Sequence, residues 1–426
     1  MSARRRYLMA VLAGLGAAIP GGAGAQSLAD RVAHAGGERI QFTYASRPGV
    51  CGDGRSYVHM ADDGVNQVYG SYGDLTAEPC VHGPARVVLD RANGEIVALR
   101  VYVGPQASDG ATDLGAVSAR EAAAYLLQLV SSAQGAVARD AILSAMLADS
   151  VHDQSALAGI AGDRTRAREI RRTAIAWLGR DAADASQAVR TLIAIATDEA
   201  DGRSVRQSAL AALTRVPDGA GIPPLIRLAG DSTGGWVGRT ALQVVAASGD
   251  PRSRDFLRGV VRAAALPDPA LAVGIRSFGS QYASAADIAV IRGAWLKLTG
   301  DRAQGAAISA VAQFGGAENV RWLMSLAANM GTTSSVRRRA LDGAVETGVP
   351  TADLVAMYDR VTDPQLEDAL ISALARADDQ AATDKLIAIA KQDENAAARR
   401  RAVDALGRLS DPRARQALES LVDRRP

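Results

Sequence analysis

The sequence predicts an α-solenoid of about nine helical hairpins, preceded by a small antiparallel β domain and by a segment for export. Three observations predict this fold class. The chain starts with basic residues and a short apolar run, residues 36–104 alternate apolar and polar side chains, and residues 117–426 repeat one helical pattern about every 33 residues.

The first 25 residues have the pattern of an export signal. The first seven contain three arginines and no acid, Leu8–Ile19 is apolar, and Ala23-Gly24-Ala25 forms a small-x-small cleavage site. The apolar run is shorter than the ~20 residues that a membrane-spanning helix needs. We therefore expect a signal peptide over residues 1–25, no membrane span in the mature chain, and a periplasmic or secreted protein. Either general secretion, which we favour, or the twin-arginine route fits.

Charge and composition restrict the classes of partner and of core. The chain has 48 Lys+Arg and 46 Asp+Glu. Removing the three arginines of residues 1–25 leaves 45 basic against 46 acidic residues, so the mature net charge is −1. A nucleic-acid-binding domain normally has a basic excess, so we expect no nucleic-acid partner. Aromatic residues are only 4%, which fits thin helical layers packed through Ala, Leu, Val and Ile.

Residues 26–116 contain the β domain and its flanking segments. We expect a short helix over 26–35, four or five strands over 36–104, and a linker over 105–116, where Pro, Gly, Ser and Asp dominate. The clearest hairpin joins residues 87–89 to 96–103 through a turn over 90–95 that contains Asn93-Gly94. In its second strand Val97, Leu99, Val101 and Val103 form the better core face.

The two cysteines, Cys51 and Cys80, lie in this β domain. In an exported chain a small even number of cysteines predicts a disulfide. A zinc site with His59 and His82 is the alternative, but the ligand spacings are not standard ones. Asp53 belongs to "CGDGRSYVHMADDG", where a calcium site with Asp62 and Asp63 is weaker than a turn-rich loop held by the disulfide.

From residue 117 a small residue recurs at a nearly constant interval and defines the repeat. We call it the anchor; an aliphatic residue follows it in every copy, and an apolar residue lies four positions after it. The anchors are Ala141, Ala174, Ala209, Ala241, Gly274, Ala307, Ala340, Ala369 and Ala402. The intervals are 33, 35, 32, 33, 33, 33, 29 and 33. One such unit holds two helices of ~12 residues and short turns, and stacked units bury a continuous core.

A second helix is expected between successive anchored helices, and "DPRARQALESLVDRR" is expected to cap the C-terminal end with its polar face. The second helices are predicted at "REAAAYLLQLVSSA", "QAVRTLIAIAT", "IPPLIRLAG", "SRDFLRGVVRAA", "AADIAVIRGAWLKL", "ENVRWLMSLAANM", "ADLVAMYDRV" and "ATDKLIAIAKQ".

The segments "SVRRRALDGA", "SVRQSALAALTRV" and "ARRRAVDALGRLSDPRARQALESLV" resemble HEAT repeats, including the HEAT-like type of the phycobilisome-lyase proteins. The resemblance covers about residues 117–425 and is weakest around Gly274 and Ala369, where we expect irregular turns. It implies that the anchored helices line the concave surface of the solenoid. In that family the concave surface mostly binds proteins, and in some members it binds peptides or nucleic acid.

Arginines recur two or three residues before the anchors. We interpret Arg139, Arg172, Arg206, Arg239, Arg338 and Arg400 mainly as structural residues. They would pair with acids such as Asp163, Asp231 and Asp393, which would cap the same helices. A basic stripe for an acidic partner is the alternative. The binding candidates on the concave face or beside the ladder are Arg171, Arg206, Arg239, Arg337, Arg339, Arg399 and Arg401.

The segment "VRRRALDGAVETG" makes this register explicit. We predict that Arg338 stabilises the fold, while charge reversal at Arg337 or Arg339 leaves folding nearly unchanged and weakens an acidic partner.

The sequence points to no enzyme. It lacks the Gly-x-Ser-x-Gly elbow, the His-Glu-x-x-His motif and the Walker loop, and only four histidines are present. We therefore expect no catalytic residues and no cofactor. The predicted function is that of an exported, non-catalytic scaffold or adaptor that binds a protein through the solenoid. The alternatives are a ligand- or metal-binding sensor centred on the β domain and, more weakly, a hydrolase of unrecognised type.

Overall fold

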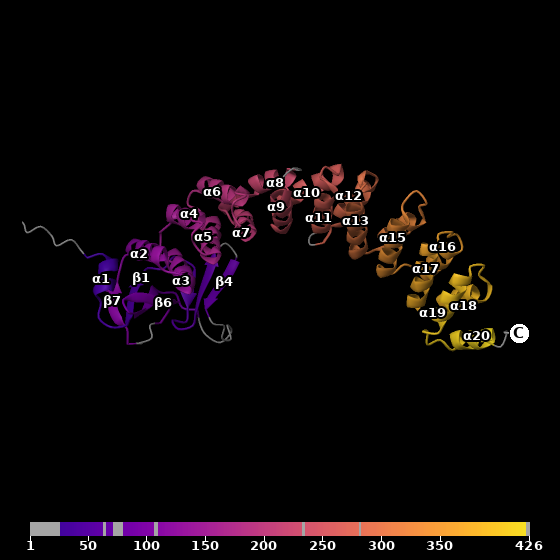
Figure 1. Cartoon of the computed structure of the whole chain (residues 1–426), viewed down its shortest axis with the longest axis horizontal. Coiled ribbons are helices and arrows are strands. Elements are labelled where there is room, and N and C mark those ends of the chain that lie inside the picture. The colour runs from indigo at the N-terminus through magenta and orange to yellow at the C-terminus, as the bar shows by residue number, and fades with distance from the viewer. Residues whose placement is uncertain are drawn as a thin grey trace, which may run out of the picture. The chain divides into compact units, whose positions relative to one another are not determined.

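The computed structural model describes residues 26–62, 65–70, 80–105, 110–231, 235–280 and 283–422. The expected signal peptide, residues 1–25, lies outside the described residues. The chain divides into two compact units, Met1–Val151 and His152–Pro426 (Figure 1). In the described parts of the chain, no helix is both long and apolar enough to cross a membrane.

The N-terminal unit combines two small sheets with three helices. A four-stranded sheet has the order β6-β5-β1-β7, and a three-stranded sheet has the order β2-β3-β4. The elements are α1 (Leu28–His34), β1 (Arg39–Tyr44), β2 (Val50–Gly52), β3 (Tyr57–Asp62), β4 (Val65–Gly70), β5 (Ala85–Ala92), β6 (Glu95–Val103), β7 (Thr112–Ala116), α2 (Ala119–Ser132) and α3 (Gly135–Met146).

The predicted β-hairpin is present, with a tighter turn than expected. Strands β5 and β6 pair as far as Ala92 and Glu95, and the two residues between them, Asn93 and Gly94, have φ values of 53° and 85°. Positive φ at both central positions is the geometry that an Asn-Gly hairpin turn favours. On β6 the expected core face is buried at Leu99 and Val103, whereas Val97 near the turn is 56% exposed.

The boundaries expected around residues 105–116 differ from the structure in two ways. Residues 112–116 do not belong to a linker, because β7 pairs parallel with β1 at the edge of the sheet. Its sequence, "TDLGA", is half-exposed and has no apolar alternation, so periodicity could not reveal it. The first helical hairpin, α2 and α3, belongs to the same compact unit as the sheets.

Helices α2 and α3 join this unit through specific contacts with the sheet. The hydroxyl of buried Tyr44 on β1 donates to the carbonyl oxygen of Ser144 on α3 at 2.5 Å. The rings of Phe42 and Tyr125 meet edge to face with centroids 6.1 Å apart. These contacts bury the inner face of the sheet against the first hairpin.

The C-terminal unit is a stack of helical hairpins followed by one last helix. Its helices are α4 (Gln154–Gly162), α5 (Arg168–Arg180), α6 (Ala185–Thr197), α7 (Arg203–Leu213), α8 (Ile222–Gly230), α9 (Gly235–Ala247), α10 (Pro251–Ala263), α11 (Asp268–Ser280), α12 (Ala285–Ala294), α13 (Asp301–Phe314), α14 (Ala317–Ala328), α15 (Ser334–Glu346), α16 (Thr351–Tyr358), α17 (Pro364–Ala377), α18 (Gln380–Gln392), α19 (Ala396–Leu406) and α20 (Pro412–Val422).

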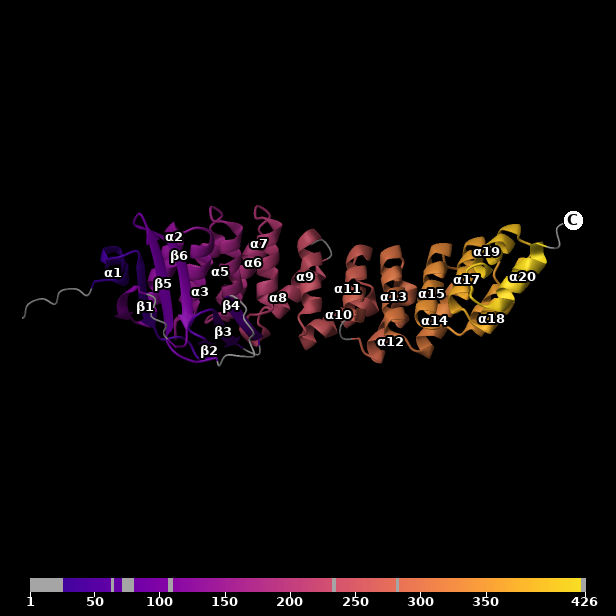
Figure 2. The same cartoon turned by 90° about the horizontal axis from the view of Figure 1, so that it is seen from below.

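Within this unit the odd-numbered helices from α5 to α19 stand side by side in one row (Figure 2). The even-numbered helices form the other row. Among the described residues there are nine hairpins, counting α2 and α3, and α20 follows as the expected cap. On α20 Ala414 and Ala417 are buried, whereas Arg415, Gln416 and Glu419 are exposed. The structure contains a helix that the sequence did not predict, α4. Its segment, "QSALAGIAG", is short and has no distinct polar face.

All nine predicted anchors lie on odd-numbered helices, from α3 to α19. Eight are buried, but Ala369 is only half-buried. The buried small and apolar positions of α15 recur in α17 at a distance of 30 residues, from Val336 and Ala340 to Leu366 and Leu370. The equivalent anchor is therefore Leu370, one residue beyond the predicted one. The repeat is shorter here because α16 has only 8 residues. Helices α11 and α17 are continuous helices, so the irregular turns expected at Gly274 and Ala369 are not found within them.

Some helices of the odd-numbered row approach so closely that only glycine fits. A Cβ atom at Gly179 on α5 would lie 2.3 Å from the carbonyl oxygen of Ala212 on α7. That distance is far inside van der Waals contact, so the two backbones would have to separate. The Leu-Gly end of this repeat is therefore a packing requirement.

We predict that Gly179→Ala lowers the free energy of unfolding by ~2 kcal/mol, because the methyl group overpacks the contact between α5 and α7. The matched control is Gly259→Ala on the exposed face of α10, where a Cβ would meet nothing within 4 Å. That change should stabilise by ~1 kcal/mol through helix propensity. Urea unfolding monitored by circular dichroism measures both. Equal effects of the two substitutions would show that the α5–α7 contact is not tight.

Candidate functional site

A buried polar side chain recurs at one position of the odd-numbered helices, the fourth residue after the N-cap. We call this the joint position. Its occupants include Arg171 on α5, Arg206 on α7 and Arg337 on α15, which are 4%, 9% and 4% exposed. A charge is rarely this buried unless it is paired and hydrogen-bonded.

Each of these arginines donates a hydrogen bond to a backbone carbonyl at the C-terminal end of the preceding even-numbered helix. The Nε atoms of Arg171, Arg206 and Arg337 donate to the carbonyl oxygens of Ala161, Ala196 and Ala327 at 2.7, 3.0 and 2.9 Å. Those carbonyls lie in the last turns of α4, α6 and α14, where no intrahelical donor is available. A guanidinium there also interacts favourably with the helix dipole.

Two of the joint arginines also hold an acid that belongs to the next hairpin. Arg171 Nη1 donates to Asp201 Oδ1 at 2.8 Å, with both side chains almost fully buried. Arg337 Nη1 donates to Asp363 Oδ2, at the N-cap of α17, at 3.1 Å. The hydrogen bond from Arg171 holds the pKa of Asp201 below its usual value despite burial. The pKa of Asp363 is lowered chiefly by the Ser334 hydroxyl, with a smaller contribution from Arg337.

Other side chains serve the same joint where arginine is not buried or is absent. Arg399 Nη1 on α19 donates to the carbonyl oxygen of Asp393 at 2.6 Å, and Gln304 Nε2 on α13 donates to that of Leu298 at 2.7 Å. On α17 the joint residue is Glu367, which accepts from Asn395 Nδ2 at 2.8 Å. On α5, α7, α13, α15, α17 and α19 the position therefore holds a long polar side chain that is not always positive, whereas on α3 it holds buried Ala138.

This geometry corrects the arginine register that the sequence suggested. Arg171, Arg206 and Arg337 are interior residues and offer no partner-facing charge, whereas Arg338 is 65% exposed in its side chain. The predicted acids were also misplaced. Asp163, Asp231 and Asp393 follow α4, α8 and α18 as C-caps and do not cap the anchored helices.

The exposed face of the odd-numbered row carries a different set of arginines, two positions before or after the anchor. Arg172, Arg239 and Arg276 lie there on α5, α9 and α11, and Arg338 and Arg400 lie there on α15 and α19. Of the other predicted binding residues, Arg339 is exposed and donates to the carbonyl oxygen of Asp301, and Arg401 pairs with Asp368 at 2.8 Å.

Acids accompany these arginines at only one end of the row. On α15–α19 the corresponding positions include Asp342, Asp368 and Asp404. The Asp342 carboxylate lies 3.9 Å from Arg338 Nε and 3.9 Å from Arg376 Nη2. On α5–α11 the two positions hold only arginine, glutamine and alanine. The exposed face of α5–α11 is therefore locally basic in a chain that is neutral overall.

A second polar cluster, which the sequence analysis missed, links α10 to α12 in the even-numbered row. Asp287 on α12 is fully buried and accepts hydrogen bonds from Arg254 and Arg258 on α10 and from Ser284, with which it forms a capping box. Desolvation opposes its ionisation, but the hydrogen bonds from Ser284 and the two arginines prevail and lower the pKa of Asp287. The Ser-x-x-Asp spacing was the available signal.

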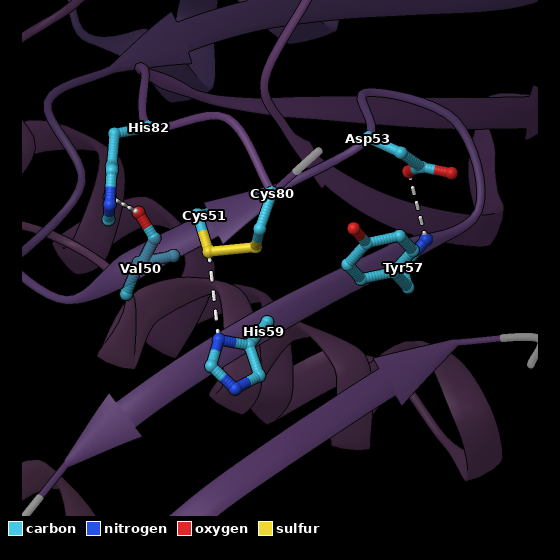
Figure 3. Close-up of a disulfide and its surroundings, with 7 residues drawn as sticks. All are labelled: Val50, Cys51, Asp53, Tyr57, His59, Cys80 and His82. Carbon is cyan, nitrogen blue, oxygen red and sulfur yellow. Dashed lines mark hydrogen bonds between the residues drawn. A yellow bond between two sulfur atoms is a disulfide. The ribbon is translucent and has the colours of Figure 1, made fainter. Parts of the chain in front are cut away.

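The disulfide between Cys51 and Cys80 is present, as predicted (Figure 3). Because the two sulfur atoms are bonded to each other, neither is available as a thiolate ligand for the alternative zinc site. His59 Nδ1 lies 3.6 Å from Cys51 Sγ. His82 points away from the sulfurs, and its Nδ1 lies 2.8 Å from the carbonyl oxygen of Val50.

The loop after Cys51 is a turn built on Asp53. The Asp53 Oδ1 atom accepts hydrogen bonds from the backbone N–H groups of Arg55, Ser56 and Tyr57 at 2.9, 2.9 and 3.2 Å. Burial opposes ionisation, but the bonds from the Ser56 hydroxyl and from these N–H groups outweigh it and lower the pKa of Asp53 to about 2. The Asp53 carboxylate therefore already accepts the hydrogen bonds that hold this turn. Asp63 of the alternative calcium site lies outside the described residues.

We predict that Arg337→Met lowers the free energy of unfolding by ~3 kcal/mol. The substitution removes the hydrogen bonds that Arg337 donates to the Ala327 carbonyl and to the Asp363 carboxylate and leaves both groups without that donor. Arg338→Met, the matched control, should change it by less than ~0.5 kcal/mol. Chemical denaturation of the two variants tests this. A larger loss at Arg338 would restore the register suggested by the sequence.

Asp53 gives a pH-dependent prediction. Its pKa is lowered on folding, so its stabilising effect is present above about pH 4 and is lost as the pH falls towards 2. Asp53→Asn keeps an acceptor oxygen but no charge, and should lower stability by ~1 kcal/mol at neutral pH. Unfolding curves of both proteins from pH 6 to pH 2 should converge at the acid end. A difference that does not change with pH would contradict this.

One comparison, with a family of known proteins, agrees with the repeat architecture at the C-terminal end. The C-terminal residues 351–426 match the family described as HEAT repeats. No curated protein sequence matches the chain. Among solved structures, human deoxyhypusine hydroxylase in complex with glycerol aligns at 20% identity, covering 64% of this chain and 91% of that one, with a TM-score of 0.25. On its repeated hairpins and the match at its C-terminal end, the chain is a HEAT-like repeat protein.

Proposed function

We propose that the protein is an exported, non-catalytic scaffold or adaptor that binds another protein along the exposed face of α5–α11. The observation that carries this proposal is the separation of two arginine sets. The joint arginines are buried and hydrogen-bonded inside the solenoid. Arg172, Arg239 and Arg276 are exposed on one face, and no acid lies two positions before or after the anchors of α5–α11. Stacked repeats present such side chains in a regular array, which suits an extended partner.

The array also defines the chemistry of the partner. Neighbouring helices in a row are ~10 Å apart, and an extended chain advances ~3.3 Å per residue. A strand-like segment crossing the row would therefore meet a new helix about every third residue. Because α7 has no arginine at these positions, we infer an extended acidic segment with two carboxylates about three residues apart opposite Arg239 and Arg276, and a third about six residues away opposite Arg172. Guanidinium groups would hold its carboxylates through charge-assisted hydrogen bonds.

Export is the second part of the proposal. It is supported by the basic and apolar pattern of residues 1–25 and by the disulfide, which is a bond typical of oxidising compartments. The metal-binding sensor is less favoured, because the disulfide occupies two of its four ligands.

The test is affinity capture from the extracytoplasmic fraction with the tagged full-length protein and a charge-reversed variant, Arg239→Glu with Arg276→Glu. Both side chains are exposed, so folding should be unchanged, while partner recovery should fall at least ~10-fold. Arg338→Glu with Arg400→Glu is the matched control on the mixed-charge end of the row and should retain the partner.

Two outcomes would contradict the proposal. Recovery that survives reversal on α9 and α11 but is lost in the control would move the binding face to α15–α19. A recovered chain that still carries residues 1–25, as shown by its intact mass, would contradict export.

A further inference from the structure

The surroundings of the disulfide are unequal on its two sides. Cys51 is buried at 5% exposure on β2, whereas Cys80 is exposed. Strand β3 pairs antiparallel with β2 so that His59 stands directly opposite Cys51. Directly opposite residues share one face of a sheet, which is why the imidazole lies against the buried sulfur, 3.6 Å away (Figure 3).

We propose that the Cys51–Cys80 disulfide is an exchangeable redox bond, in which an external thiol attacks Cys80 and His59 stabilises Cys51 as the leaving thiolate. Cys80 is the exposed residue of the pair, so its sulfur is the electrophile that an external thiol would reach. The buried sulfur is the one that has a hydrogen-bond donor in place, since the Nδ1–H tautomer of His59 can donate to it. Thiol–disulfide exchange is faster when the leaving thiolate is stabilised, and a neighbouring imidazole stabilises a cysteine thiolate.

The reaction is an ordinary thiol–disulfide exchange with two external thiols. The first external thiolate bonds to Cys80 Sγ, the Cys51–Cys80 bond breaks, and Cys51 leaves with the electron pair. The second external thiolate attacks the external sulfur of this mixed disulfide and releases the Cys80 thiolate. The external thiols are thereby oxidised to a disulfide, and the protein gains two electrons and two protons.

The fold provides for the return reaction as well. Immediately beside the disulfide, Gly52 and Val81 exchange two backbone hydrogen bonds, N–H to O=C, at 3.0 and 2.9 Å. These bonds do not depend on the sulfur atoms. They should keep the segment that contains Cys80 beside β2 after reduction, so the two thiols remain close enough to be oxidised again.

His82 shows that proximity alone does not give a histidine this role. It follows Cys80 by two residues, but its Nδ1 lies against the carbonyl oxygen of Val50 and not against sulfur. His82 therefore supports the backbone and is the matched control for His59.

The experiment measures reduction of the oxidised full-length protein by glutathione. In the wild-type protein, quenching with N-ethylmaleimide and peptide mass spectrometry should find glutathione on Cys80 and the alkyl group on Cys51. His59→Ala should slow reduction ~10-fold, while His82→Ala should stay within about two-fold of wild type. After full reduction, the ultraviolet thiolate absorbance should appear at lower pH in wild type than in His59→Ala.

Several results would overturn the proposal. Glutathione found on Cys51, or equal rates for wild type and His59→Ala, would remove His59 from the exchange. Resistance of the folded wild-type protein to reduction would make the bond purely structural. The position of the adduct is read in the wild-type protein, so the test remains decisive even if His59→Ala folds poorly.

Discussion

Three hairpins of the solenoid are built around a buried guanidinium, which in two of them serves two neighbours at once. Behind it in the sequence, it satisfies the carbonyl end of an even-numbered helix; ahead of it, in two repeats, it holds the carboxylate of the next hairpin. Neither group could be buried without a partner, because an unsatisfied carbonyl or carboxylate loses its hydration without compensation. Burial of the joint thus links the turn within one hairpin to its stacking against the next.

This constraint decides which surface is left for function. Residues at the joint position face the interior, so the next residue, ~100° around the helix, is the one that solvent or a partner can reach. That residue is an arginine on α5, α15 and α19. The distinction lies in one residue of register. It turns an apparent triple-arginine cluster at residues 337–339 into one interior residue and two surface residues.

The repeat, the paired helices, the terminal cap and the disulfide could all be predicted from the sequence, because each leaves a periodic or compositional signal. The arginine register was also available but was missed. Arg171, Arg206 and Arg337 each lie three residues before a buried anchor and therefore on its helix face, whereas Arg172 and Arg338 lie two residues before it and are exposed. The sequence-based ladder mixed these two positions. Strand β7 was missed because an edge strand paired on one side needs no apolar alternation. The proximity of His59 to the disulfide follows from strand register, which residue spacing alone did not reveal.

The joints have a direction along the chain. The carbonyl that each arginine caps is synthesised before it, but Asp201 and Asp363 follow Arg171 and Arg337 by 30 and 26 residues. A nascent chain that ends between the members of such a pair contains a cation ready for burial and no anion to neutralise it. Each of these hairpins therefore completes its interior only when the next one has emerged. A chain truncated within such a gap would therefore end in a repeat whose buried arginine has no acid to neutralise it.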